Sequence, residues 1–154
     1  MQRIRATAQL DCPKERAEAL LPEFFDARRD RHGSVRVTLS LTLEDLGLPG
    51  AIGVAREVEV RIERRRDEEN LNDEYGIDWS PAGGGPYPDF HGRMAVWAGE
   101  TPGASYIELD GSYEPPLGSV VGEVFDAAVG RTIAERTARR FLEEVAAGIT
   151  ALAA

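Results

Sequence analysis

The sequence has few of the residues from which metal sites and disulfides are built. Its 154 residues include one cysteine, Cys12, and two histidines, His32 and His91. One cysteine cannot form an intrachain disulfide, and the histidines lack the H-x-x-H or H-E-x-x-H spacing of a zinc site. The sequence also lacks a G-x-S-x-G nucleophile elbow. It therefore predicts no metal, no cofactor and no catalytic residues from these motifs.

Lysine is also scarce, and acidic residues outnumber basic ones. Lys14 is the only lysine, and the formal net charge is −9 at pH 7. The one basic run, at 64–66, is followed directly by three acidic residues at 67–69, which cancel its field. Because phosphate backbones are bound through clustered Lys and Arg, this balance predicts that nucleic acid is not a partner.

Long apolar runs are missing as well. No stretch approaches the roughly 20 residues that span a bilayer, and the first residues, MQRIRATAQL, lack the apolar core of a secretory signal. We therefore expect no membrane insertion and a cytoplasmic location. Hydrophobic residues make up 42% of the chain and charged residues 29%, as in globular proteins. Since no repeat or low-complexity linker divides the chain, we predict one domain over residues 1–154.

Most of the sequence consists of segments with a hydrophobic period of two. In SVRVTLSLTL, at 34–43, Val35, Val37 and Leu39 alternate with polar residues, which is typical of a strand with one buried face. The other predicted strands lie at 2–10, 54–63, 75–79, 90–98 and 106–113. The residues E-T-P-G at 100–103 predict a hairpin turn. Together these patterns indicate an antiparallel sheet with one covered face and one wet face.

A period near 3.6 marks the end of the chain. From 119 to about 151, apolar residues recur at helical spacing and charged residues occupy the opposite face, which predicts a long helix covering the sheet. The apolar face consists of Ala134, Ala138, Phe141, Leu142, Val145 and Ile149.

Two short helices are expected after the first strand. Asp11 and Pro13 predict a helix start, and this helix would end at about residue 21, before Pro22. A second helical piece would run from 23 to about 31 and end at Gly33. Phe24 and Phe25 would pack this piece against the core.

This order of elements is that of the helix-grip fold. The stretch 107–145, IELDGSYEPPLGSVVGEVFDAAVGRTIAERTARRFLEEV, resembles the SRPBCC or START-like superfamily, which includes polyketide cyclases, pollen allergens and lipid-transfer domains. By element order the likeness covers nearly the whole chain, and it is most specific at 111–142. The residues that carry it are Tyr113, Pro116, Gly118, Phe125, Asp126, Gly130, Arg131 and Ala134. The sequence departs from the family at 13–33, which is short for the two helices that support the long helix.

The resemblance implies an α+β helix-grip domain, with an antiparallel sheet of about six strands wrapped around the C-terminal helix. It also implies a cavity between the sheet and the helix for a hydrophobic or amphipathic small molecule. Small residues in the first half of the helix, such as Gly122 and Gly130, would leave space for it. The residues expected to line this cavity are Tyr75, Trp79, Tyr87, Phe90, Met94, Tyr113, Phe125 and Val129.

The main hypothesis for function is therefore binding of a small apolar or aromatic ligand without catalysis. Two alternatives stay open, because one fold supports many functions. The first is a cyclase or dehydratase acting on a polyketide-like substrate, with Tyr75, Tyr113 or His91 assisting proton transfer. The second is a protein-interaction module, such as a homodimer, whose cavity is filled by its own side chains.

Two features near the middle of the chain have two interpretations each. His91 could act as a general base if Asp78 or Asp89 oriented it, but strand parity places it on the wet face, as it does Trp97. The stretch SPAGGGPYPD, at 80–89, predicts a loop between strands at an open end of the sheet. Tyr87 in this loop would either gate the cavity or lie on the surface.

Overall fold

The computed structural model describes residues 2–42, 53–67, 69, 72–81, 89–114 and 127–154. Within these ranges, the side chains of 39–42, 53–57, 66–67, 81, 114, 127–130 and 133 lie outside the description. The elements are β1 (Gln2–Leu10), α1 (Lys14–Asp26), β2 (Val35–Thr42), β3 (Gly53–Asp67), β4 (Asn72–Pro81), β5 (Asp89–Ala98), β6 (Ser105–Glu114) and α2 (Ala127–Ala153).

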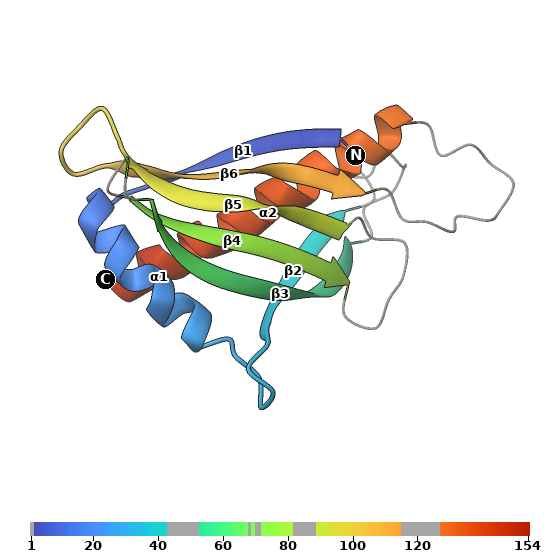
Figure 1. The fold of residues 1–154 in the computed structure, drawn as a ribbon, viewed down its shortest axis with the longest axis horizontal. Coiled ribbons are helices and arrows are strands. Elements are labelled where there is room, and N and C mark those ends of the chain that lie inside the picture. Colours follow the sequence, from blue (N-terminus) through green and yellow to red (C-terminus); the bar gives the residue numbers. More distant parts are fainter. Residues whose placement is uncertain (1, 43–52, 68, 70–71, 82–88, 115–126) are drawn as a thin grey trace, which may run out of the picture.

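The strands form one six-stranded sheet in the order β1-β6-β5-β4-β3-β2, and every neighbouring pair is antiparallel. Figure 1 shows the sheet curled around α2, with α1 beside the C-terminal end of that helix. This confirms the predicted α+β helix-grip architecture. The predicted turn at 100–103 is also present, with the Gly99 N–H donating to the Ala104 carbonyl at 2.9 Å.

The core lies between the inner face of the sheet and the two helices. All six apolar residues that helical spacing placed on the covering face of α2 are buried, with exposed fractions of at most 1%: Ala134, Ala138, Phe141, Leu142, Val145 and Ile149. Alternate residues of the strands are buried on the inner face of the sheet, such as Val58 and Val60 of β3 or Ile107 and Leu109 of β6. Burial of this apolar surface is the main favourable contribution to folding.

The first helix differs from the prediction. Instead of two pieces broken at Pro22, α1 is one helix over Lys14–Asp26 that contains this proline. The helix continues because Leu21, Phe24 and Phe25 lie on both sides of the proline and are fully buried, so packing outweighs the local cost of the proline.

The segment expected to end the second helical piece is a turn. The Asp30 carboxylate accepts hydrogen bonds from the N–H groups of His32 at 2.8 Å and Ser34 at 3.0 Å. Gly33 has φ of 80°, a left-handed conformation that favours glycine. Asp30 therefore shapes the turn into β2.

The C-terminal helix is described from Ala127, and its 27 residues span about 40 Å at 1.5 Å per residue. The first part of the predicted helix, 119–126, lies outside the described residues. Neither described helix has the length and hydropathy required to cross a membrane.

Candidate functional site

Three of the predicted ligand residues lie in one row across the inner face of the sheet. Strand register pairs Trp79 of β4 with Phe90 of β5, and Phe90 with Tyr113 of β6. The Trp79 and Phe90 rings stack with their centroids 4.2 Å apart and an interplanar angle of 17°. Phe141 of α2 covers Trp79 from the helix side, with the ring centroids 5.1 Å apart. These rings form an aromatic layer between the sheet and α2.

Two glycines make room for this layer. Gly92 and Gly111 face each other across β5 and β6, and a Cβ on either would lie 2.6 Å from Phe90 Cζ. Non-bonded carbon atoms do not approach that closely. The Phe90 ring therefore packs directly against the backbone of these two residues, which is possible only because neither has a side chain. The depth of the interior at this point therefore depends on the Gly92–Gly111 pair.

Trp79 also carries a buried polar atom without a partner. Its side chain is 3% exposed, and Nε1 forms no hydrogen bond to the residues that the structure describes. An unsatisfied buried donor costs about 1–3 kcal/mol. The indole N–H is thus available to an acceptor that enters the interior.

Tyr113 is engaged at the far end of the same row. Its hydroxyl donates to Gln2 Oε1 at 2.6 Å. Burial raises the pKa of this hydroxyl, while Arg131 of α2 opposes the change. Because Arg131 itself pairs with Glu135 at 2.8 Å, Tyr113 lies beside a charged pair on the N-terminal half of α2.

Tyr75 lies two rows away, near α1. Its register partner is Met94, and its ring centroid lies 6.3 Å from that of Phe25. The hydroxyl is buried without a hydrogen bond in the described part of the chain, and burial is the main reason that its pKa is raised. Glu18 contributes to this rise, although its own Oε1 pairs with Lys14 Nζ at 3.4 Å. Tyr75 and Tyr113 therefore lie at different ends of the interior.

The structure brings together five of the eight predicted ligand residues. Those buried on the inner face are Tyr75, Trp79, Phe90, Met94 and Tyr113. Tyr87 and Phe125 lie outside the described residues, as does 82–88 of the loop predicted at 80–89. The ends of that predicted loop belong to strands, Ser80 to β4 and Asp89 to β5. Val129 lies in α2, and its side chain is not among those described. The ligand role of all eight residues stays a prediction.

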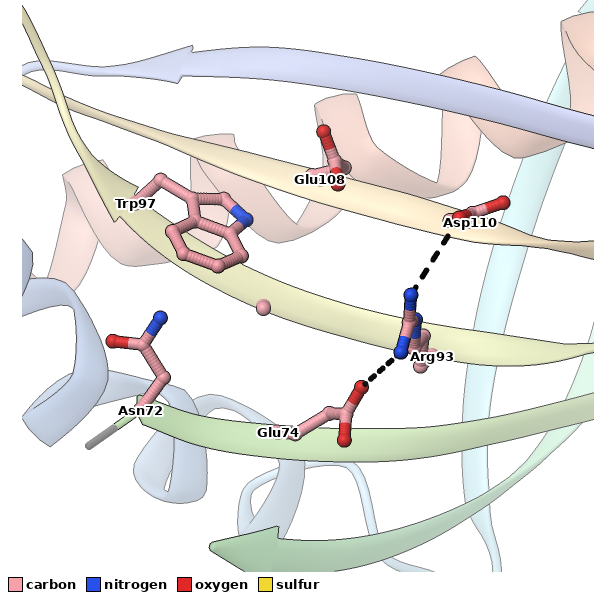
Figure 2. Close-up of a pocket in the computed structure, with 7 residues that line it drawn as sticks. Asn72, Glu74, Arg93, Trp97, Glu108 and Asp110 are labelled. Atoms are coloured by element: carbon pink, nitrogen blue, oxygen red, sulfur yellow. Dashed lines mark ion pairs between the residues drawn. The ribbon is translucent and has the colours of Figure 1, made fainter. Parts of the chain in front are cut away.

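The outer face of the sheet carries features that the sequence analysis missed. A hollow of about 100 Å³ lies over Ala95, with Trp97 on one side and Arg93 on the other. Figure 2 shows the Arg93 guanidinium between Glu74 and Asp110, at 3.3 Å and 3.9 Å. Alternation along the predicted strands at 90–98 and 106–113 placed Arg93, Trp97 and Asp110 on the wet face. The pairing of strands that brings them together with Glu74 could not be inferred from spacing.

The charges around this hollow are paired across strands. Arg3 of β1 donates two hydrogen bonds to Asp110 of β6, at 3.0 Å and 2.7 Å. These bonds are the main reason that the pKa of the Asp110 carboxyl is lowered. Arg5 of β1 donates two hydrogen bonds to a single oxygen of Glu108, Oε2, from Nε at 2.9 Å and from Nη2 at 2.5 Å. The outer face therefore holds a ladder of ion pairs over β1, β6, β5 and β4.

His91 lies on this outer face, as strand parity predicted. Its Nδ1 is 2.7 Å from Asp78 Oδ1, so one of the two orienting partners considered from the sequence is in place. Both side chains are about half exposed. Among the described residues, no group of three His, Cys, Asp or Glu side chains is arranged to hold a metal ion.

No protein-family model and no curated protein matches the sequence. Solved structures match it in fold. Ara h 8.0201 is 12% identical, with 98% of this chain and 96% of that chain covered and a TM-score of 0.49. The di-domain ARO/CYC BexL from the BE-7585A biosynthetic pathway is 13% identical, with coverages of 98% and 46% and a TM-score of 0.47. A START superfamily protein from Mycobacterium smegmatis is 13% identical, with coverages of 97% and 95% and a TM-score of 0.40.

At these identities the likeness concerns the fold alone, and this chain spans less than half the length of BexL. The fold itself is the helix grip that the sequence predicted. This assignment rests on the chain's own architecture, an antiparallel six-stranded sheet curled around a C-terminal helix.

Proposed function

We propose that the protein binds a small amphipathic molecule between the sheet and α2, without chemical turnover. The observation that supports this most directly is the Trp79 indole N–H, a buried donor beside stacked aromatic rings that has no acceptor among the described residues. Ligand sites are mostly apolar, with a few polar groups that fix orientation. A flat ligand carrying one acceptor oxygen would match both the ring layer and this donor.

A matched pair of probes tests the proposal. Fluorenone and fluorene have nearly the same shape, but only fluorenone carries a carbonyl acceptor. A net hydrogen bond of about 0.5–1.5 kcal/mol predicts that fluorenone binds roughly 2- to 10-fold more tightly. Binding is followed by Trp79 emission in a Trp97→Phe background, which removes the tryptophan of the outer face.

The control is Trp79→Phe, which keeps an aromatic ring but lacks the donor. In equilibrium dialysis this variant should bind both probes equally. Native mass spectrometry of the purified protein, followed by extraction, would show whether an apolar molecule is retained from the cell. If neither probe binds and no molecule is retained, the proposal is wrong.

A further inference from the structure

Strand pairing places three residues of different chemistry side by side on the outer face of the sheet. Asp78 of β4 is the register partner of His91 of β5, and His91 is the partner of Ser112 of β6. Residues directly opposite one another in antiparallel strands have Cβ atoms about 4.5–5.5 Å apart and share a face. A carboxylate, an imidazole and a hydroxyl therefore form one row across three adjacent strands.

The contact between Asp78 and His91 determines which nitrogen of the neutral imidazole carries the proton. His91 Nδ1 lies 2.7 Å from Asp78 Oδ1. Because a carboxylate only accepts hydrogen bonds, Nδ1 carries the proton, and the lone pair of the neutral ring is at Nε2. Nε2 forms no hydrogen bond within the described ranges. An imidazole oriented in this way can take a proton from a neighbouring hydroxyl.

The row borders an open hollow in which a small molecule could lie. This hollow, of about 550 Å³, is lined by His91 and Ser112 together with Arg3, Gly92, Arg93, Asp110 and Gly111. Arg93 is 63% exposed, and its distances to Glu74 and Asp110, 3.3 Å and 3.9 Å, are long for charged hydrogen bonds. Its N–H groups can therefore turn toward negative charge that develops on a bound carbonyl oxygen.

We propose that Ser112, His91 and Asp78 form an acyl-transfer site for small carboxylic esters. Ser112 Oγ attacks the ester carbonyl carbon, while His91 Nε2 takes the hydroxyl proton and delivers it to the leaving alcohol oxygen as the C–O bond breaks. Water, deprotonated by the same nitrogen, then attacks the acyl-serine, releases the acid and restores the hydroxyl. Asp78 holds the ring and stabilises the imidazolium. This site lies on the face of the sheet opposite the proposed ligand interior and does not depend on it.

Hydrolysis of p-nitrophenyl acetate tests the site. We expect release of p-nitrophenolate and an acetyl group on the peptide that contains Ser112, found by mass spectrometry. Ser112→Ala should lose the acetyl group and slow hydrolysis at least about 10-fold, and Asp78→Asn should slow it while keeping the adduct. Ser112→Cys retains a nucleophile and should still be acetylated, which separates loss of chemistry from loss of fold.

Two matched controls account for hydrolysis by ordinary surface groups. His32→Gln removes the other histidine, which is exposed, and Ser80→Ala removes an exposed serine of β4 on the same outer face as Asp78. Both should hydrolyse the ester at the wild-type rate. The proposal is overturned if Ser112→Ala also retains that rate, or if acetyl groups are found only on other residues such as Lys14.

Discussion

At Gly148 the two helices approach so closely that the position has no room for a side chain. A Cβ there would lie 2.1 Å from Phe24 Cε2. The Phe24 ring cannot easily move away, because the Arg28 guanidinium lies 3.8 Å from its centroid and Phe25 packs edge-on at 5.2 Å. This one glycine therefore sets the distance between α1 and α2.

Replacing this glycine by alanine should destabilise the protein. Overpacking costs about 1–3 kcal/mol, and the higher helix propensity of alanine returns at most about 1 kcal/mol. At so short an approach we expect a net loss of about 1–2 kcal/mol in the free energy of unfolding, measured with urea. Gly103→Ala is the matched control, because a Cβ there meets nothing within 4 Å. Equal free energies of unfolding for the two variants would contradict this prediction and show that the Phe24 ring can move away from the added methyl group.

At the scale of elements, α1 shows how local and tertiary preferences compete. Proline inside a helix removes one backbone hydrogen bond and clashes with the carbonyl four residues earlier, here that of Glu18. The sequence alone therefore favours a break at Pro22. The buried Leu20, Leu21, Phe24 and Phe25 on either side hold the segment in one helix.

Pro22→Ala should accordingly stabilise the protein. The new N–H can donate to the Glu18 carbonyl, and this gain exceeds the roughly 0.4–1 kcal/mol by which proline restricts the unfolded chain. We expect an increase of about 1 kcal/mol or more, seen as a higher melting temperature. Pro13→Ala is the control, because Pro13 lies at the N-cap, where only its carbonyl is used, by the Ala17 N–H at 3.0 Å. A lower melting temperature for Pro22→Ala would contradict this view of α1.

The elements themselves were largely predictable, whereas their contacts were not. Alternation identified a strand and its buried face at 106–113, and likewise in the described part of 34–43, where Val35 and Val37 are buried. Helical spacing identified the buried face of α2. Those signals are local, so they are visible in one sequence. The error at Pro22 arose because packing between distant segments decided the outcome.

The candidate sites depend on register, which is a property of two strands together. Parity placed Trp79 and Phe90 inside and His91 outside, but it could not show that Trp79 stacks on Phe90. Nor could it show that Ser112 lies opposite His91, since the pairing of β5 with β6 depends on where the hairpin turns. The hollow beside Trp97 was missed for the same reason.

At the scale of the whole molecule, ion pairs on the outer face tie the strands together. The Asp110 carboxyl, 13% exposed, receives two hydrogen bonds from Arg3, and its pKa is lowered from 3.8. The pKa values of the Asp30 and Glu63 carboxyls are also lowered. When the pKa of a carboxyl is lower in the folded than in the unfolded chain, its full contribution to the stability of the fold is present at any pH above the unfolded-state pKa. It is lost as the pH falls through the folded value.

The protein should therefore lose stability on acidification below about pH 4, and Asp110 should account for part of the loss. In urea unfolding at pH 7 and at about pH 3, Asp110→Asn should lose less stability between the two conditions than the wild type does. Arg3→Gln removes the partner instead of the carboxyl and should have the same effect. An unchanged difference in both variants would show that this pair does not contribute to acid sensitivity.

The position of β1 at the edge next to β6 also bears on how the chain assembles. Strands β2 to β6 follow one another along the sheet, whereas the Arg3–Asp110 contact joins residues 107 positions apart. Closing so long a loop is entropically unfavourable and slows folding. During synthesis, the apolar side of β1, with Ile4 and Leu10, has no neighbouring strand until β6 has left the ribosome. Until then this first strand is the segment most exposed to mispairing with another copy of the chain.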